Sequence, residues 1–160
     1  MTFLTKQLAV KVPAITAFFW IIKVLATTTG ETFSDWINET LGFGLVNTTA
    51  VMTVVMAVLL VMQVRSTTYR PWLYWLNIVV VSIDGTLLTD NLTDGMDFPL
   101  LYSMIIFGLL LVATFIWWYR KEKSLAMKSI NTRERELFYW LAILLTFAMG
   151  TATGDYLGDA

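Results

Sequence analysis

The sequence contains neither cysteine nor histidine among its 160 residues. Disulfide bonds, thiolate sites and imidazole ligands are therefore excluded, and a bound metal ion would need oxygen ligands. Oxygen ligands favour hard cations such as Mg²⁺, Mn²⁺ or Na⁺. The formal net charge of −1 favours no polyanionic partner, so we expect no nucleic acid. The sequence has no nucleophile–base motif and no phosphate-binding loop, so we expect neither an enzyme nor a cofactor.

Long apolar runs are the main feature of the sequence, in which 57% of residues are hydrophobic. A membrane helix needs about 20 mostly apolar residues. Five segments meet that need, at 15–37, 46–64, 72–92, 99–119 and 137–157. No small-residue cleavage site follows a short apolar core near the start, so we interpret the first run as a retained helix. The sequence predicts an all-α, polytopic membrane helical bundle with five transmembrane helices.

The two kinds of charge lie on opposite sides of these predicted spans. The loops at 38–45 and 91–98 contain no Lys or Arg, whereas the N-terminal segment and the other two loops contain ten of the eleven basic residues. By the positive-inside rule, the N-terminus is cytoplasmic and the C-terminus of this chain lies outside. The basic residues on the inner side are Lys6, Lys11, Arg65, Arg70, Arg120, Lys121, Lys123, Lys128, Arg133 and Arg135. The acidic residues predicted on the outer side are Asp35, Glu39, Asp90, Asp94, Asp97, Asp155 and Asp159.

One pattern occurs three times and indicates an internal repeat. It consists of an aromatic–Trp pair, a Gly ten residues after the Trp, and an Asp five residues after the Gly. The copies are about 55 and 65 residues apart: Phe19/Trp20–Gly30–Asp35, Tyr74/Trp75–Gly85–Asp90 and Tyr139/Trp140–Gly150–Asp155. We expect a single membrane domain, 1–160, with repeat one at 12–64, repeat two at 69–119 and partial repeat three at 132–160. Each full repeat would pair an outward motif helix with a plainer return helix, so the repeats are parallel.

Ionisable residues at membrane depth are costly, and they suggest a functional site. The candidates for transport or ion binding are Lys23, Thr27, Glu31, Asp35, Asn77, Asp84, Asp90 and Asp155. The first four follow at i+4 and share one helix face, and Asn77 and Asp84 share another. From the helical rise, Asp84 lies near mid-membrane, about 13 Å beyond the Trp of its repeat. If the three motif helices pack around a common axis, Lys23, Glu31 and Asp84 converge to coordinate a cation, relay protons or bind a small zwitterion.

Structural explanations of the same residues stay open. Lys23 follows Trp20 closely, so its stem can snorkel to the cytoplasmic interface. Glu31 and Asp84 can pair with Lys23 or with threonines as a buried polar lock. The three repeat aspartates, Asp35, Asp90 and Asp155, can cap the outer ends of helices.

Glycines of the repeats are candidates for helix packing. Gly150, Gly154 and Gly158 form a series of small residues at every fourth position, which lets a second helix approach closely. Gly30 and Gly85 lie beside polar runs. Either they allow close packing, or they mark a local kink that exposes backbone carbonyls, as in transporters with broken helices.

Three stretches of the chain resemble a bacterial family of integral membrane proteins made of tandem two-helix repeats of unknown function. They are KVPAITAFFWIIKVLATTTGETFSD, YRPWLYWLNIVVVSIDGTLLTDNLTD and ERELFYWLAILLTFAMGTATGD. The resemblance implies the repeat fold and a bacterial inner (cytoplasmic) membrane, and it carries no established activity. Members of that family usually have four repeats and about eight helices, so this chain would cover two and a half.

Two functions are consistent with these observations. The leading hypothesis is a small transporter or exporter of a cation, or of a solute coupled to cations or protons, with Lys23, Glu31 and Asp84 along the path. The alternative is a non-catalytic structural or interaction protein that acts as a homo-oligomer through its glycine series. The expected partners are the lipid bilayer, a second copy of the chain, and a hard cation or a proton.

Overall fold

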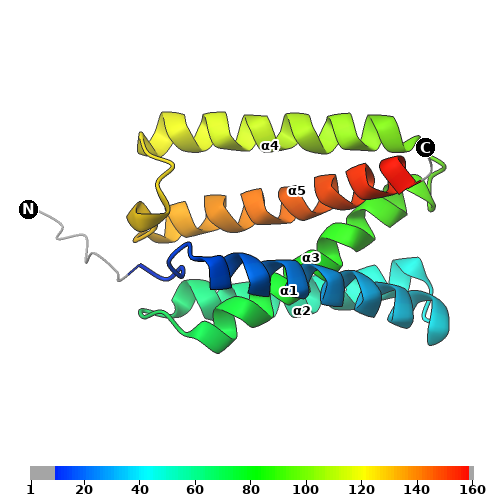
Figure 1. Ribbon diagram of the computed structural model, residues 1–160, viewed down its shortest axis with the longest axis horizontal. Helices are drawn as coiled ribbons and strands as arrows, with labels where there is room; N and C mark the ends of the chain where they lie inside the picture. Colours follow the sequence, from blue (N-terminus) through cyan, green and yellow to red (C-terminus); the bar gives the residue numbers. More distant parts are fainter. Residues whose placement is uncertain (1–9, 159–160) are drawn as a thin grey trace, which may run out of the picture.

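The structure, a computed structural model, describes residues 10–158, apart from the side chain of Lys128. Lys6, Asp159 and the last residues of the predicted third repeat lie outside the described residues. The described chain is all-helical, as predicted, and contains five α-helices (Figure 1). They are α1 (Ala17–Asp35), α2 (Leu45–Arg65), α3 (Pro71–Thr93), α4 (Leu100–Glu122) and α5 (Arg133–Gly158). A π-helical turn, η1 (Trp36–Thr40), continues α1, and a short 3₁₀ turn, η2 (Met127–Ser129), precedes α5.

Local sequence signals explain where the helices begin and end. The Thr16 hydroxyl accepts a hydrogen bond from the Phe19 amide at 3.2 Å and caps the start of α1. Pro71 occupies the first turn of α3, where no backbone donor is needed. Gly44, with φ of 77°, turns the chain into α2, and Lys123 ends α4 in the left-handed conformation with φ of 56°.

Helix α3 is the centre of the bundle. It packs against α1, α2 and α5, while α4 lies on the far side of α5 (Figure 1). Because three helices cover α3, most of its side chains are buried, including Tyr74, Ile78 and Leu87, which have no exposed surface. A helix covered on all sides carries no clear apolar stripe. The polar residues of α3 therefore face neighbouring helices and not solvent.

Four of the helices, α2 to α5, are long and apolar enough to cross a membrane. Helix α2 and helix α4 have strongly exposed apolar side chains, for example Val54 at 64% and Leu109 at 65%. Such surfaces suit contact with lipid. Among the described helices, α1 is not apolar enough to be counted with these four, because Lys23, Glu31 and its threonines interrupt its apolar residues. The prediction of five spans is therefore confirmed in part, and the crossing by α1 stays a prediction.

The helices that carry the repeated pattern, which we call the motif helices, are α1, α3 and α5. Their glycines make equivalent contacts. A Cβ added at Gly30 of α1 would overlap the Ser82 hydroxyl of α3, and a Cβ added at Gly85 of α3 would lie 2.6 Å from the Phe147 Cβ of α5. Ser82 and Phe147 each stand three residues before the glycine of their own repeat. Successive motif helices thus pack in the same manner, and α1 and α3 continue through Gly30 and Gly85 without a break.

The aromatic residues of successive motif helices also pack on one another in a repeated manner. Phe19 packs on Trp75 with ring centres 5.7 Å apart, and Tyr74 packs on Trp140 at 5.6 Å. The aromatic residue of one repeat therefore contacts the Trp of the next. Among the described residues no aromatic residue of another repeat packs on Trp20, and 56% of its surface is exposed.

Candidate functional site

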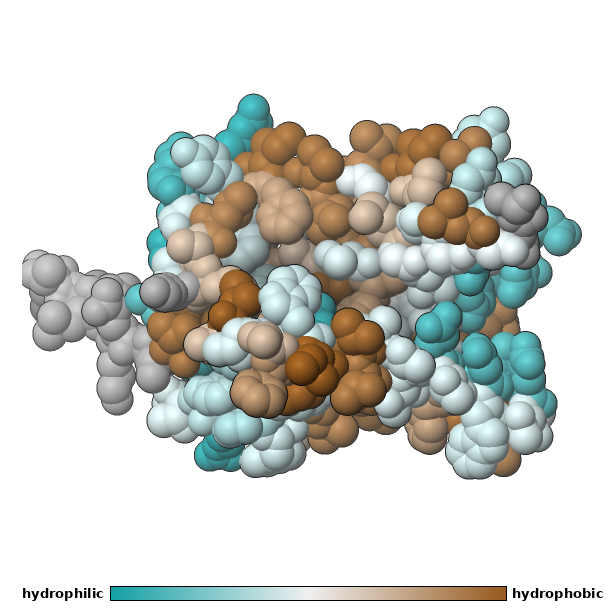
Figure 2. Space-filling model, in the orientation of Figure 1, coloured by the Kyte–Doolittle hydropathy of each residue, from teal (hydrophilic) through white to brown (hydrophobic). Residues whose placement is uncertain are grey.

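A cleft of about 570 Å³ lies between α1, α3 and α5. Its volume is within the usual range for sites that bind small molecules. On the face shown in Figure 2, hydrophilic residues gather toward the ends of the molecule, including the region between the C-terminal halves of α1 and α5. The charged, hydroxyl-bearing and aromatic residues that line the cleft are Trp20, Lys23, Thr27, Glu31, Ser82, Thr86, Thr146, Phe147, Thr151 and Asp155. The structure therefore brings together Lys23, Thr27, Glu31 and Asp155 from the predicted set.

Lys23 is the cation of this cleft. Its ammonium nitrogen is buried and has no hydrogen-bond partner among the described residues. The nitrogen lies 4.5 Å from the centre of the Phe147 ring, a distance typical of a cation–π contact. No ion pair within the described part of the chain includes Lys23. Among the described residues, therefore, no carboxylate forms an ion pair with this ammonium group.

The hydroxyl groups of the cleft mostly use their protons within the protein. Thr27 and Thr146 each donate to the backbone carbonyl four residues earlier, at 2.8 and 2.6 Å. Ser82 donates to the carbonyl three residues earlier at 2.8 Å. The hydroxyl oxygens of Thr86 and Thr151 lie 3.2 Å apart, so one donates to the other. Each hydroxyl oxygen that donates keeps lone pairs with which it can accept a hydrogen bond.

The carboxylates gather near the C-terminal ends of the three motif helices. Glu31 and Asp155 line the cleft. The carboxylate of Asp90 lies close enough to those of Asp35, Asp155, Glu31 and Asp94 to interact with them electrostatically. The three repeat aspartates are thus neighbours in space. Among the described residues, however, no group of three or more acidic side chains is placed to hold a metal ion.

Asp84 does not join Lys23 and Glu31, and the expected convergence of these three residues is wrong. Asp84 is 1% exposed and accepts a hydrogen bond at 2.8 Å from Thr53 of α2. Asn77 faces the same way, since its amide lies 3.4 Å from a backbone carbonyl of α2. The physical reason is that α3 is central, so the face that carries Asn77 and Asp84 packs on α2 and not on α1 or α5.

These residues belong to a polar seam between α2 and α3, formed by Asn77, Asp84 and Asn91 at intervals of seven residues. The Asn91 amide donates to the Thr49 hydroxyl of α2 at 2.6 Å. Hydrogen bonds of this kind hold helices together where apolar burial contributes little. One carboxylate oxygen of Asp84 is buried without a hydrogen-bond partner among the described residues.

The predicted glycine series lies along α5 beside the cleft. Gly150 and Gly154 line the cleft, and Gly158 ends the helix. A Cβ added at any of the three would meet no atom of the described chain within 4 Å. None of the described helices, therefore, packs closely on the series.

The sequence reasoning missed a buried ionic cluster at the opposite end of the bundle. Lys11 forms an ion pair with Glu136 at the start of α5, and both side chains are 1% exposed. Gln63, at the end of α2, donates to Glu136 at 3.2 Å. The Lys11 ammonium also donates to three backbone carbonyls around the end of α2, at 3.3, 3.1 and 2.9 Å. This cluster, which we call the Lys11 lock, fastens the segment before α1 to both helices.

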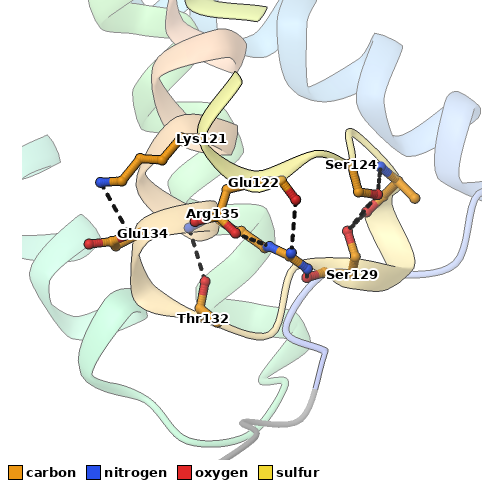
Figure 3. A network of polar contacts seen from close by, with 8 residues as sticks. Lys121, Glu122, Ser124, Ser129, Thr132, Glu134 and Arg135 are labelled. Atoms are coloured by element: carbon orange, nitrogen blue, oxygen red, sulfur yellow. Dashed lines mark hydrogen bonds and ion pairs between the residues drawn. The ribbon is translucent and has the colours of Figure 1, made fainter. Parts of the chain in front are cut away.

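The connection between α4 and α5 is also tied by charges (Figure 3). Arg135 donates to Glu122 at 2.6 Å and to the Ser129 carbonyl at 2.7 Å. The Thr132 hydroxyl accepts from the Arg135 amide at 3.3 Å, immediately before α5 begins at Arg133. Lys121 and Glu134 form a further ion pair, but 47% and 60% of these side chains are exposed. Ion pairs and hydrogen bonds within this basic region therefore hold the end of α4 to the start of α5.

Comparison with known families identifies the repeat. A family model described as "Repeat of Unknown Function (DUF347)" matches residues 18–69 and 73–124, together more than half of the chain. The chain therefore belongs to this family, in agreement with the resemblance seen in the sequence. Comparisons with curated proteins and with solved structures give no match.

Proposed function

We propose that this member of the repeat family is a small transporter of the bacterial inner membrane, which moves a cation or a polar solute coupled to cations or protons. One observation carries the proposal. The cleft between the motif helices is lined by Lys23, Glu31, Asp155 and several hydroxyl groups, although it lies in a bundle of membrane-type helices. Charged residues at such depth usually face a substrate path.

In this proposal α1 is the fifth span and the N-terminus is cytoplasmic. The ends of the bundle support this orientation. The connections that contain Arg65, Arg70 and the basic residues from Arg120 to Arg135 lie at the end of the bundle where α1 begins (Figure 1). The opposite connections, 36–44 and 94–99, contain no Lys or Arg. That asymmetry matches the positive-inside rule.

Asp84 would supply the coupling. Its carboxyl group is buried against α2, and no cation pairs with it in the described ion pairs. A buried carboxylate without a partner is costly, whereas a protonated carboxyl group is not. Binding and release of a proton at Asp84 would therefore change how tightly α3 holds α2, and α3 forms one side of the cleft.

The test is flux into proteoliposomes that contain the purified full chain. Internal pH and charge movement are recorded while Na⁺, K⁺, Mg²⁺, Mn²⁺ and small amino compounds are presented outside. We expect one of these solutes to produce flux, and both Glu31→Ala and Asp84→Ala to abolish it while the variants insert and fold. Glu39→Gln is the matched control, because Glu39 is exposed on η1. If both alanine variants fold and transport like the wild type, the proposal fails.

The open glycine series favours a second candidate, a homo-oligomeric interaction protein. Gly150, Gly154 and Gly158 leave a face of α5 that accepts a close helix, and no described residue occupies it. We expect Gly154→Leu to abolish dimers in mild detergent without loss of membrane insertion. A wild-type chain that stays monomeric at high concentration would exclude this candidate.

A further inference from the structure

We infer that the cleft binds a small zwitterion, with the anionic group of the ligand on Lys23 and its ammonium group toward Glu31. This inference rests on the proposed function, because it names the substrate class of the same site. It goes further by giving the ligand two opposite charges and a direction in the cleft.

Lys23 is the residue that would bind the anionic group of the ligand. A buried ammonium group needs acceptors, and the Lys23 nitrogen has none among the described residues. The Phe147 ring at 4.5 Å attracts a cation but accepts no conventional hydrogen bond. No described group accepts a hydrogen bond from this ammonium group, so a ligand in the cleft can supply the missing acceptors. A carboxylate of the ligand would supply acceptors and opposite charge together.

The hydrogen-bond acceptors in the rest of the cleft would bind the ammonium group of the ligand. Thr27 and Thr146 have already used their hydroxyl protons on backbone carbonyls, so their free lone pairs can only accept. Glu31 adds a carboxylate that is exposed to the cleft and forms no ion pair within the described residues. A site with one cation and many acceptors does not suit a simple anion. A simple cation, in turn, would leave Lys23 without a partner.

The spacing of the two charged residues sets the size of the ligand. Lys23 and Glu31 are eight residues apart on one helix, which places their backbones about 12 Å apart along the axis. Both side chains are long enough to reach toward each other. A ligand whose charges are separated by a short chain therefore bridges them better than one whose charges share a carbon atom.

The experiment measures binding to the full chain in lipid nanodiscs by isothermal titration calorimetry. The probes are 4-aminobutanoate, its shorter analogue glycine, and the single-charge analogues butanoate and butylamine. We expect 4-aminobutanoate to bind at least tenfold more tightly than either single-charge analogue, and more tightly than glycine. Lys23→Met should lower its affinity to that of butylamine, Glu31→Gln should lower it to that of butanoate, and Lys23→Arg should retain selective binding.

Lys121→Met and Glu39→Gln are the matched controls, since both residues are exposed and neither lines the cleft. Equal affinity for all four probes, absence of binding, or unchanged affinity in both cleft variants would overturn the inference. Selective binding without flux would support the zwitterion site and contradict transport. Flux of an inorganic cation without binding of 4-aminobutanoate would support transport and overturn the zwitterion site.

Discussion

Replacing either charged residue of the Lys11 lock should strongly destabilise the bundle, and by different amounts. Lys11 and Glu136 are both buried, and removal of one partner of a buried ion pair costs about 3–5 kcal/mol. That is a large fraction of the roughly 5–15 kcal/mol by which a folded protein is usually stable. The remaining hydrogen bonds of the lock decide which variant loses more.

In Glu136→Gln, the Lys11 ammonium keeps its three backbone carbonyl acceptors at 3.3, 3.1 and 2.9 Å. The loss should therefore lie near the lower limit, about 3 kcal/mol. In Lys11→Met, the Glu136 carboxylate loses its only cation among the described ion pairs, although Gln63 still donates to it at 3.2 Å, and three carbonyls lose their shared donor. That loss should lie near the upper limit, about 5 kcal/mol. The double variant should lose less than the sum of the single variants, because neither charge is left alone.

The assay is equilibrium unfolding in mixed micelles, followed by the fluorescence of the seven tryptophans. Glu134→Gln is the control, because its ion pair with Lys121 is exposed and should contribute no more than about 1 kcal/mol. The reasoning would be refuted if Glu136→Gln lost more stability than Lys11→Met. It would also be refuted if the two single losses simply added in the double variant.

Two further predictions concern the contacts between motif helices. Gly30→Ala should destabilise the bundle in the same unfolding assay, and Ser82→Gly should partly restore it, because the added Cβ overlaps the Ser82 side chain. Overpacking costs about 1–3 kcal/mol and exceeds the helix-propensity gain of about 1 kcal/mol. Tyr74→Phe should cost about 1–3 kcal/mol, since Tyr139, whose hydroxyl lies 2.5 Å away, loses its partner. Tyr139→Phe in the same chain should add little, and an equal second loss would contradict this prediction.

The helices and the repeat could be predicted from the sequence because both depend on local patterns. Apolar runs of membrane length gave the positions of all five helices to within a few residues. The fixed spacing of Trp, Gly and Asp identified α1, α3 and α5 as related helices before their packing was known. The i+4 spacing also placed Lys23, Thr27 and Glu31 on one face, and the structure puts that face on the cleft.

The position of Asp84 could not be predicted in the same way. A central helix presents a different neighbour on each face, so its own sequence does not tell which neighbour a polar residue will meet. Asn77 and Asp84 were correctly placed on a shared face, but only the packing shows that this face contacts α2. The Lys11 lock could not be predicted from the sequence for a related reason. Lys11, Gln63 and Glu136 are far apart in the chain, and each resembles an ordinary polar residue beside a span.

The packing of α1 explains how it can carry Lys23 and Glu31, two charges that the equivalent positions of α3 lack. The residue equivalent to Lys23 on α3 is Ile78, which has no exposed surface, and the residue equivalent to Glu31 is Thr86, which is 5% exposed. A charge at the position of Ile78 would be enclosed between helices, and burial of a charge without a partner is costly. On α1 the equivalent positions, Lys23 and Glu31, line the cleft. The packing therefore leaves room for charged side chains at these two positions of α1, where both Lys23 and Glu31 line the cleft.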